Sequence, residues 1–460
     1  MKLESKCSSI KLSEQGTNLN YVGKEKSQWR DASKKIVYDK NSIALFNGLT
    51  EVQDQLIVSA LRSLGEDFVA LPIPDFDSFQ KGKAFGNRGQ CNPTYFTVGN
   101  LVKYLQELQQ ETKLSSSEIV QKYFLVTAGG CGPCRFGMYI TEYKKALRDA
   151  GFEGFRVTSF EHNKGIFQDT SKELVNYSPK FFVALVKAVS IGDIINIMGY
   201  KIRPYECEKG ATDKAMNECR SMVSEAFEKR KNLTLALLKC RKIMQNIEQD
   251  RREKKVKVMV MGEFWAAMTE GDGNYNLHRF LESEGAECLP QPMINRLLLS
   301  IWEANHELEK SISVENYDAK SVDFTQMKTK IMIQLAKSSL LLHFKIYSWA
   351  IGLKDYDIPN MEKLSNLAKA YYPLDSSGGE GFLEVAHLIE SVKENLADLV
   401  ISVKPFGCMP SSSVSDGIQS LITNRFPSSN FLAIETSGEG GANFYSRVQM
   451  ALFKAKENVS

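Results

Sequence analysis

Short apolar runs rich in β-branched residues recur at intervals through the first part of the chain, and each predicts a buried strand. These runs are residues 42–46, 67–71, 123–128 and 155–159. Between them, apolar positions at helical spacing predict helices over 51–64, over 97–110 and after Arg135. Because strands and helices alternate, this part of the sequence predicts a parallel four-stranded sheet covered by helices.

The same alternation returns in the second part of the chain. Four further strands are predicted at residues 256–261, 286–289, 398–403 and 431–435. A long helical block at about 293–373 interrupts this second unit between its second and third strands. Helices are also expected at 276–283, at about 415–423 and from Asn443 onward. We therefore predict an α/β fold with two parallel four-stranded sheets.

The remaining segments complete the predicted domain organisation. Residues 1–40 are polar and lack periodicity, and they are interpreted as a flexible extension. A first α/β domain is predicted over 41–178, a helical linker over 179–255, and a second α/β domain, carrying the insertion, over 256–460. Within the linker, residues 212–249 read as one long helical segment with a charged face.

Composition narrows the class of protein. The 460 residues have a net charge of only +3, with basic residues dispersed, so no nucleic-acid partner is expected. The start of the chain lacks the apolar region of a secretory signal, and no uninterrupted apolar run reaches the ~18–20 residues of a membrane span. Nine scattered cysteines in such a chain suit a reducing cytoplasm, where clustered thiols are metal ligands or catalysts more often than disulfides.

Four cysteines stand at the predicted ends of strands. Cys91 lies in a glycine-rich loop after the second strand, Cys131 and Cys134 follow the third, and Cys408 follows the third strand of the second unit. Both third strands end in a glycine–cysteine turn. Ligands in open α/β sheets sit beyond the carboxyl ends of the strands, so thiols from separate loops can converge there on one iron–sulfur cluster.

Other interpretations of these thiols are simpler. A single C-x-x-C is also typical of a thioredoxin-like redox pair, and structural zinc is a further alternative, although zinc sites usually show two close pairs. Glu263, just past a strand, is either an acid of a substrate pocket or the cap of the next helix. The other five cysteines are interpreted as small apolar residues or surface thiols; they are Cys7, Cys207, Cys219, Cys240 and Cys288. For Cys207 and Cys219, metal ligation is the alternative interpretation.

Taken together, four motifs resemble the 2-hydroxyacyl-CoA dehydratase family. They are Gly89-Gln-Cys91-Asn-Pro93, Cys131-Gly-Pro-Cys134-Arg-Phe-Gly137, Gly262-Glu263 and Pro405-Phe-Gly-Cys408-Met-Pro410. The chain is most similar to the dehydratase-like module associated with CoA-substrate-specific activases, a branch related to double-cubane cluster proteins. The resemblance covers about residues 40–455.

The resemblance implies that both α/β domains are Rossmann-like and that an iron–sulfur cluster, either 4Fe–4S or double-cubane 8Fe–9S, lies between them. It implies Cys91, Cys131 and Cys408 as ligands, with Cys134 as a fourth ligand, a replacement for Cys131, or a ligand of the larger cluster. A separate ATP-dependent activase would donate a low-potential electron, and a (2-hydroxy)acyl-CoA thioester would react through a ketyl radical. The chain would then be a dehydratase-like lyase or a cluster-based reductase component of anaerobic metabolism, working with a homologous subunit or as a homodimer. The alternative is a non-catalytic electron-transfer or scaffold protein that works with the activase.

Overall fold

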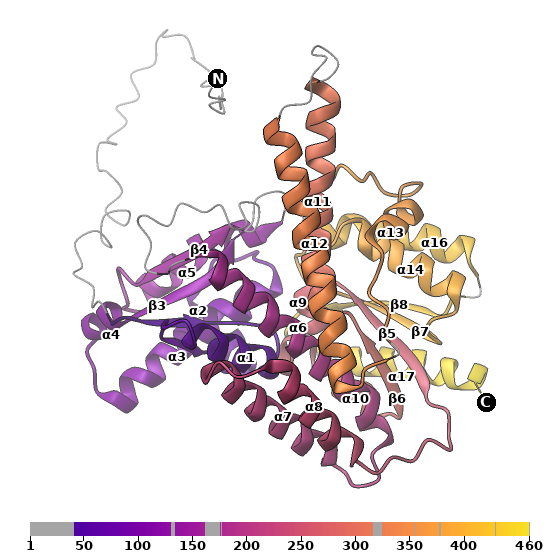
Figure 1. Ribbon diagram of the computed structural model, residues 1–460, viewed down its shortest axis with the longest axis horizontal. Helices are drawn as coiled ribbons and strands as arrows, with labels where there is room; N and C mark the ends of the chain where they lie inside the picture. Colours follow the sequence, from indigo (N-terminus) through magenta and orange to yellow (C-terminus); the bar gives the residue numbers. More distant parts are fainter. Residues whose placement is uncertain are drawn as a thin grey trace.

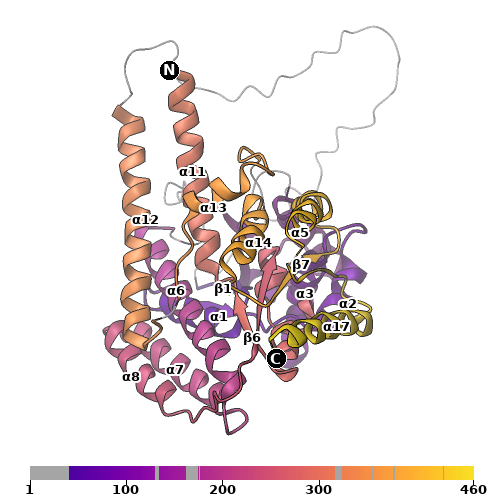
Figure 2. The same cartoon turned by 90° about the vertical axis from the view of Figure 1, so that its right-hand side faces the viewer.

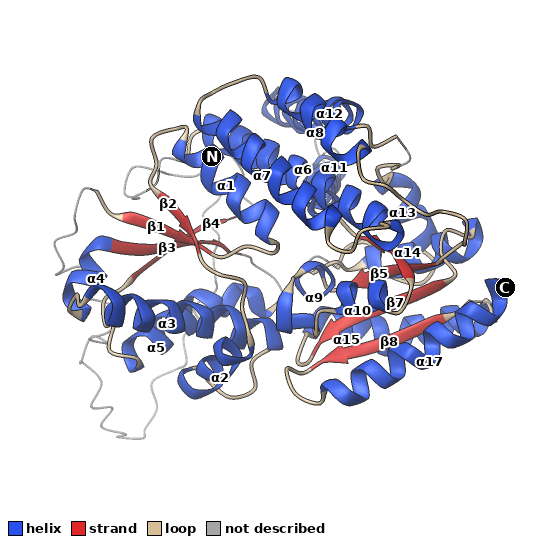
Figure 3. Ribbon diagram, turned by 90° about the horizontal axis from the view of Figure 1, so that it is seen from below, coloured by secondary structure: helices blue, strands red, loops and turns tan. Residues whose placement is uncertain are grey.

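The computed structural model contains two parallel sheets, one built from each part of the chain (Figures 1 and 3). The structure describes residues 41–129, 134–161, 175, 177–315, 324–354, 356–376, 379–427 and 429–459. The predicted N-terminal extension, Cys7 and Cys131 lie outside the described residues.

The first sheet has the strand order β2-β1-β3-β4 and is parallel throughout. Its strands are β1 (Ile43–Phe46), β2 (Phe68–Ala70), β3 (Tyr123–Gly129) and β4 (Arg156–Glu161). The helices along this part are α1 (Glu51–Arg62), α2 (Phe76–Phe85), α3 (Asn92–Thr112), α4 (Ser116–Lys122) and α5 (Tyr139–Asp149), with a 3₁₀ turn, η3 (Arg135–Met138), before α5. Leu45 and Leu125 are fully buried, as expected for strands covered on both faces.

The second sheet repeats this topology with the order β6-β5-β7-β8, again parallel. Its strands are β5 (Val256–Gly262), β6 (Ala286–Pro290), β7 (Leu399–Pro405) and β8 (Phe431–Thr436). The predicted α/β class and both four-stranded parallel sheets are confirmed.

Helices join the strands of the second part. Three short ones are α9 (Phe264–Met268), α10 (Leu277–Ser283) and α16 (Ser420–Arg425), with a 3₁₀ turn, η6 (Gly271–Asn274), between the first two. The insertion between β6 and β7 holds α11 (Met293–Glu315), α12 (Phe324–Ile351), α13 (Met361–Ala368) and α14 (Phe382–Glu394). The C-terminal helix is α17 (Gly441–Val459), and the segment after β7 runs through α15 (Met409–Ser413) and a π-helical turn, η7 (Val414–Gln419).

Several helices differ from the sequence expectations. Helices α2 and α4 were not predicted, and α3 begins at Asn92, five residues before the expected start, because Pro93 occupies its first turn. The segment 212–249 is two helices, α7 (Ala211–Glu228) and α8 (Leu233–Gln245), because Asn232 caps a new helix start. The single π turn inside the expected helix at 415–423 is a further departure.

Among the described residues, one helix satisfies the length and composition of a membrane span, although charged residues interrupt its apolar sequence. It is α6 (Pro179–Ile202), continued by the 3₁₀ turn η5 (Arg203–Tyr205), and 61% of its most apolar window is buried inside the protein. Its buried Asp193 accepts hydrogen bonds from the backbone N–H groups of Met293 (3.0 Å) and Ile294 (2.8 Å). A polar contact that caps another helix identifies α6 as a core helix of a globular fold.

The first part of the chain contributes side chains to the core of the second. Phe79 of α2 and Phe96 of α3 are fully buried in the cluster that covers the second sheet. The Phe79 and Phe96 rings lie 5.0 Å apart between centroids, and Phe96 lies 5.7 Å from Trp265 of α9. The two sheets are therefore joined by a continuous aromatic contact, which fixes the loops at their facing edges.

Candidate iron–sulfur site

Three of the four predicted cysteine ligands are described, and each lies at the start of a helical turn. Cys91 is the N-cap residue of α3, Cys134 is the N-cap of η3 after β3, and Cys408 follows β7 directly before α15. Cys91 and Cys408 are buried, whereas Cys134 is half-buried. Cys91 was predicted in the loop directly after the second strand, but helix α2 intervenes between β2 and this loop.

The loops of Cys91 and Cys408 are bonded to each other although they come from different sheets. The Asn92 backbone N–H donates to the Phe406 carbonyl at 2.9 Å. Gly407 has φ +76°, and a Cβ atom there would lie 3.2 Å from the Cys91 Cα atom. Glycine therefore permits both the left-handed turn and the close approach that brings the two cysteines together.

Side chains of the first unit fix the position of the Cys91 thiol. The hydroxyl oxygens of Thr94 and Tyr139 each lie 3.1 Å from Cys91 Sγ. Glu142 of α5 accepts hydrogen bonds from the backbone N–H of Asn87 (3.1 Å) and from the side-chain amide of Gln90 (3.1 Å). The preceding loop is thus anchored to α5, and the thiol has little conformational freedom.

The Cys134 turn is tied to the same loop. The Arg135 guanidinium donates a hydrogen bond to the Gly89 carbonyl. Cys134 also lies close enough to Cys91 for the two thiols to interact electrostatically. The Cys134 turn is thus bonded to the loop of Cys91, which is itself bonded to the loop of Cys408.

Three glutamates of the second unit lie near these loops; Glu380 and Glu384 are buried, and Glu263 is half-buried. Glu263 caps α9 after β5, and its Oε2 atom accepts from the Ala266 N–H at 2.9 Å. Glu380 precedes α14, and Glu384 lies in the first turn of α14, where it accepts from the Ser411 hydroxyl at 2.8 Å. The cap that the sequence offered as one alternative for Glu263 is thus present, and the same carboxyl also lies at the thiol site.

Burial controls the protonation of this cluster. It raises the pKa of Glu263 and of Glu380 well above the ordinary range, and it raises the pKa of Glu384 to about 8. Mutual repulsion among the three carboxylates adds to the effect. At neutral pH burial therefore favours the neutral, proton-bearing form of Glu263 and Glu384, whereas Arg296 counteracts this effect at Glu380.

The thiols respond to the same environment. Burial raises the pKa of Cys91 and of Cys408, and it raises the pKa of Cys134 to about 11. Electrostatic repulsion from Glu263 adds to the increase at all three sulfurs. Without a bound cation the three thiols are protonated, so a metal centre would bind with release of their protons.

The described side chains do not form a ready-made site for a metal ion. Within the described ranges, no group of three or more His, Cys, Asp or Glu side chains is arranged to hold one. A single zinc ion needs its donors to converge at about 2.0–2.3 Å. In an iron–sulfur cluster each thiolate binds a different iron, so sulfurs from separate loops can remain farther apart.

Sequence reasoning found Glu263 but missed Glu380 and Glu384. Glu384 could have been recognised from the sequence, because it stands between apolar residues at the start of a helix, Phe382-Leu-Glu384-Val-Ala. A charged residue flanked by such side chains is rarely fully buried without a specific role. The support from Tyr139 and Glu142 was also missed, because nothing local in α5 marks these two residues.

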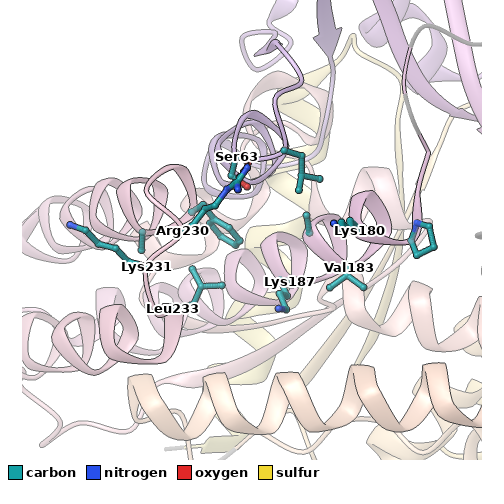
Figure 4. A pocket seen from close by; sticks show the side chains of 12 residues that line it. Ser63, Lys180, Val183, Lys187, Arg230, Lys231 and Leu233 are labelled. Carbon is teal, nitrogen blue, oxygen red and sulfur yellow. Dashed lines mark hydrogen bonds between the residues drawn. The ribbon is translucent and has the colours of Figure 1, made fainter.

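The remaining described cysteines lie away from this site. Cys219 and Cys240 face each other between α7 and α8, each sulfur contacting the backbone carbonyl of the other residue. Cys288 is buried in β6, and Cys207 is exposed. A separate pocket of ≈ 400 Å³ has the basic side chains Lys180, Lys187, Arg230 and Lys231 around apolar Val183 and Leu233 (Figure 4). None of its lining residues belongs to the thiol loops.

No family model matches the chain, and no curated protein matches it.

Proposed function

We propose that this chain is the iron–sulfur component of an ATP-activated, low-potential reductase or dehydratase that acts on a (2-hydroxy)acyl-CoA or similar thioester. The observation that carries this proposal is the joining of three cysteine-bearing loops from both sheets, through the Asn92–Phe406 and Arg135–Gly89 hydrogen bonds. The chain would be a lyase of the 2-hydroxyacyl-CoA dehydratase type or a reductase component of the same chemistry.

Cys91, Cys134 and Cys408 would hold the cluster, with Cys131 as a further candidate outside the described residues. A 4Fe–4S or double-cubane cluster would supply single electrons at low potential, within the span of roughly −700 to +450 mV available to such centres. The apolar surroundings of Cys91 and Cys408 keep water from the thiols.

The three glutamates give this site a source of protons. Expulsion of a hydroxyl group needs a proton at the departing oxygen. Glu384 Oε2 and Glu380 Oε1 are buried and have no hydrogen-bond partner within the described residues, while the other oxygen of Glu384 is held by Ser411. Each carboxyl is thus a neutral acid with a free oxygen, which favours a catalytic role over simple electron transfer.

The proposal includes partners and a location. An ATP-dependent activase would deliver the electron, and a homologous subunit or a second copy would complete the working unit. The low potential and the free thiols suit a reducing cytoplasm.

The test is to measure iron and acid-labile sulfide per chain after purification without oxygen, together with EPR spectra before and after reduction. We expect about four irons for one cubane or about eight for a double cubane. A reduced EPR signal that shifts when an acyl-CoA is added would support catalysis, whereas an unchanged signal would support an electron carrier. Zinc without sulfide would refute the iron–sulfur assignment.

Matched cysteine variants locate the cluster. Cys91→Ser, Cys134→Ser and Cys408→Ser should each reduce bound iron, while Cys207→Ser, at an exposed thiol, should retain it. Full retention of iron in Cys408→Ser would exclude a site shared by the two sheets. Circular dichroism of each variant separates cluster loss from unfolding.

A further inference from the structure

Helices α11 and α12 form a long antiparallel hairpin that projects from the body of the protein (Figures 1 and 2). Helix α12 has 28 residues, which corresponds to a length of about 42 Å. Its inner face packs on α11 and, nearer its C-terminal end, on α6 and α8. Its opposite face lies at the edge of the molecule, with no described element covering it in either view.

That outer face is a continuous apolar stripe. Its members are spaced three, four or seven residues apart, which keeps them on one side of a helix. They are Phe324, Met327, Ile331, Leu335, Leu342, Ile346 and Trp349, with exposed fractions from 39% to 80%. Such a row of large exposed side chains is uncommon on a protein that remains monomeric and marks an interaction surface.

The stripe is complementary to itself. Its positions are symmetric about the middle of α12, between Ala336 and Lys337. If two copies of α12 lie antiparallel, Phe324 faces Trp349 of the second copy, Met327 faces Ile346, and Ile331 faces Leu342. Leu335 then faces Ser338, the one polar position of the series. A two-fold axis produces this pairing, since each contact occurs twice.

Charge does not prevent the pairing. Helix α12 has no acidic residue and four lysines. Lys330 and Lys337 are bonded within the same chain, to Glu309 at 3.0 Å and to Glu362 at 2.8 Å. In this register Lys328 of one copy faces Lys345 of the other, and the contact occurs twice. Both lysines lie beside the stripe, where each can lay its stem along apolar surface and direct its ammonium group into water, away from the other.

We propose that the outer face of α12 is a homodimer interface, in which two copies of the chain pair their α12 helices antiparallel about a two-fold axis through Ala336–Lys337. The two hairpins together then form a four-helix arrangement in which the apolar stripes are buried. This inference is independent of the metal content of the thiol site.

The first measurement is the mass of the full chain in solution by analytical ultracentrifugation at micromolar concentration. We expect a dimer, and we expect the double variant Ile331→Glu with Leu342→Glu to raise its dissociation constant at least 100-fold. The control is Met450→Glu with Phe453→Glu, which places the same charges on exposed apolar residues of α17. A monomeric wild-type chain, or a dimer that the α12 variant leaves unchanged, would overturn the proposal.

Disulfide trapping tests the antiparallel register in a Cys207→Ser background. Leu335→Cys lies next to the proposed axis, so two copies should cross-link under mild oxidation. Phe324→Cys alone should not cross-link, because its two copies would be about 37 Å apart along the helix. A mixture of Phe324→Cys and Trp349→Cys chains should form the cross-linked heterodimer. Cross-linking by Phe324→Cys alone would indicate parallel pairing and contradict the model of the dimer.

Discussion

The two sheets share one topology but divide the chemistry of the site between them. Both have the third and fourth strands on one side of the first and the second strand on the other. The first unit supplies Cys91 and Cys134, together with the hydroxyl groups of Thr94 and Tyr139 that contact Cys91. The second unit supplies Cys408 and all three glutamates.

This difference follows from where each unit carries its additional helices. In the first unit, α2 lies between β2 and Cys91, and it shapes the loop that holds the thiol. In the second unit, the insertion between β6 and β7 contains α14. Glu384 in its first turn and Glu380 just before it lie near the Cys408 loop. The strand ends of the two units are equivalent, but the segments that connect the strands place different side chains beside them.

Two glycines with positive φ, one in each unit, give the largest expected difference between the units. Gly262 ends β5 with φ +121°, and a Cβ there would lie 2.1 Å from the Val403 carbonyl oxygen, part of a rigid strand. We expect Gly262→Ala to cost about 3 kcal/mol or more of the free energy of unfolding, measured by urea denaturation. Gly65→Ala, at φ +92° with open space around it, should cost only about 1–2 kcal/mol. An equal loss of stability in the two variants would show that the backbone near Val403 moves easily to accommodate the added methyl group of Gly262→Ala.

The aromatic contact between the units should have the next largest effect. Phe79→Ala removes a fully buried ring from the core of the second unit, at an expected cost of about 3–5 kcal/mol. Thermal unfolding should also become less cooperative, because the two units lose a shared core. Phe76→Ala, at a ring that is 47% exposed, is the control and should cost less than about 1 kcal/mol. A single sharp transition in Phe79→Ala would argue against coupling through this contact.

Protonation of the second unit makes stability depend on pH. Burial raises the folded-state pKa of Glu384 to about 8, above its value in the unfolded chain. The folded state therefore keeps a proton that the unfolded state loses, and stability should fall as pH rises from about 4.5 to 8 and then level. Glu384→Gln should remove up to about 5 kcal/mol of this decline, seen in urea titrations across that pH range. Glu435→Gln, on an exposed position of β8, should leave the decline unchanged.

The ion pair between the units should matter least. Lys83 Nζ lies 3.3 Å from Glu439 Oε1, and both side chains are largely exposed. We expect Glu439→Gln to change the free energy of unfolding by less than about 1 kcal/mol, and by less still at high salt. A larger loss would mean that charge, and not the aromatic contact, joins the two units.

The fold could be anticipated because its strands are local signals. Apolar β-branched runs such as Tyr123–Gly129 identify strands without knowledge of their neighbours. Helix α2 was missed, since its amphipathic pattern is weak and its capping by Asp75 depends on a hydrogen bond from the Ser78 backbone. The positions of Cys134 and Cys408 followed from strand ends, whereas α2 separates Cys91 from its strand. Glu380 and Glu384 lie more than a hundred residues from Glu263 in the sequence.

The sequence by itself determined the two parallel sheets and the loops that carry Cys91, Cys134 and Cys408, because hydrophobic periodicity and strand-ending glycines act over a few residues. Only the tertiary structure decided that Asn92 bonds to Phe406, that Glu380 and Glu384 join Glu263, and that α12 leaves an apolar face uncovered. These features depend on contacts between segments distant in the chain. Packing decides which carboxyl groups are buried, and therefore which pKa values are raised, and it decides which helix face is covered. No local sequence pattern contains this information.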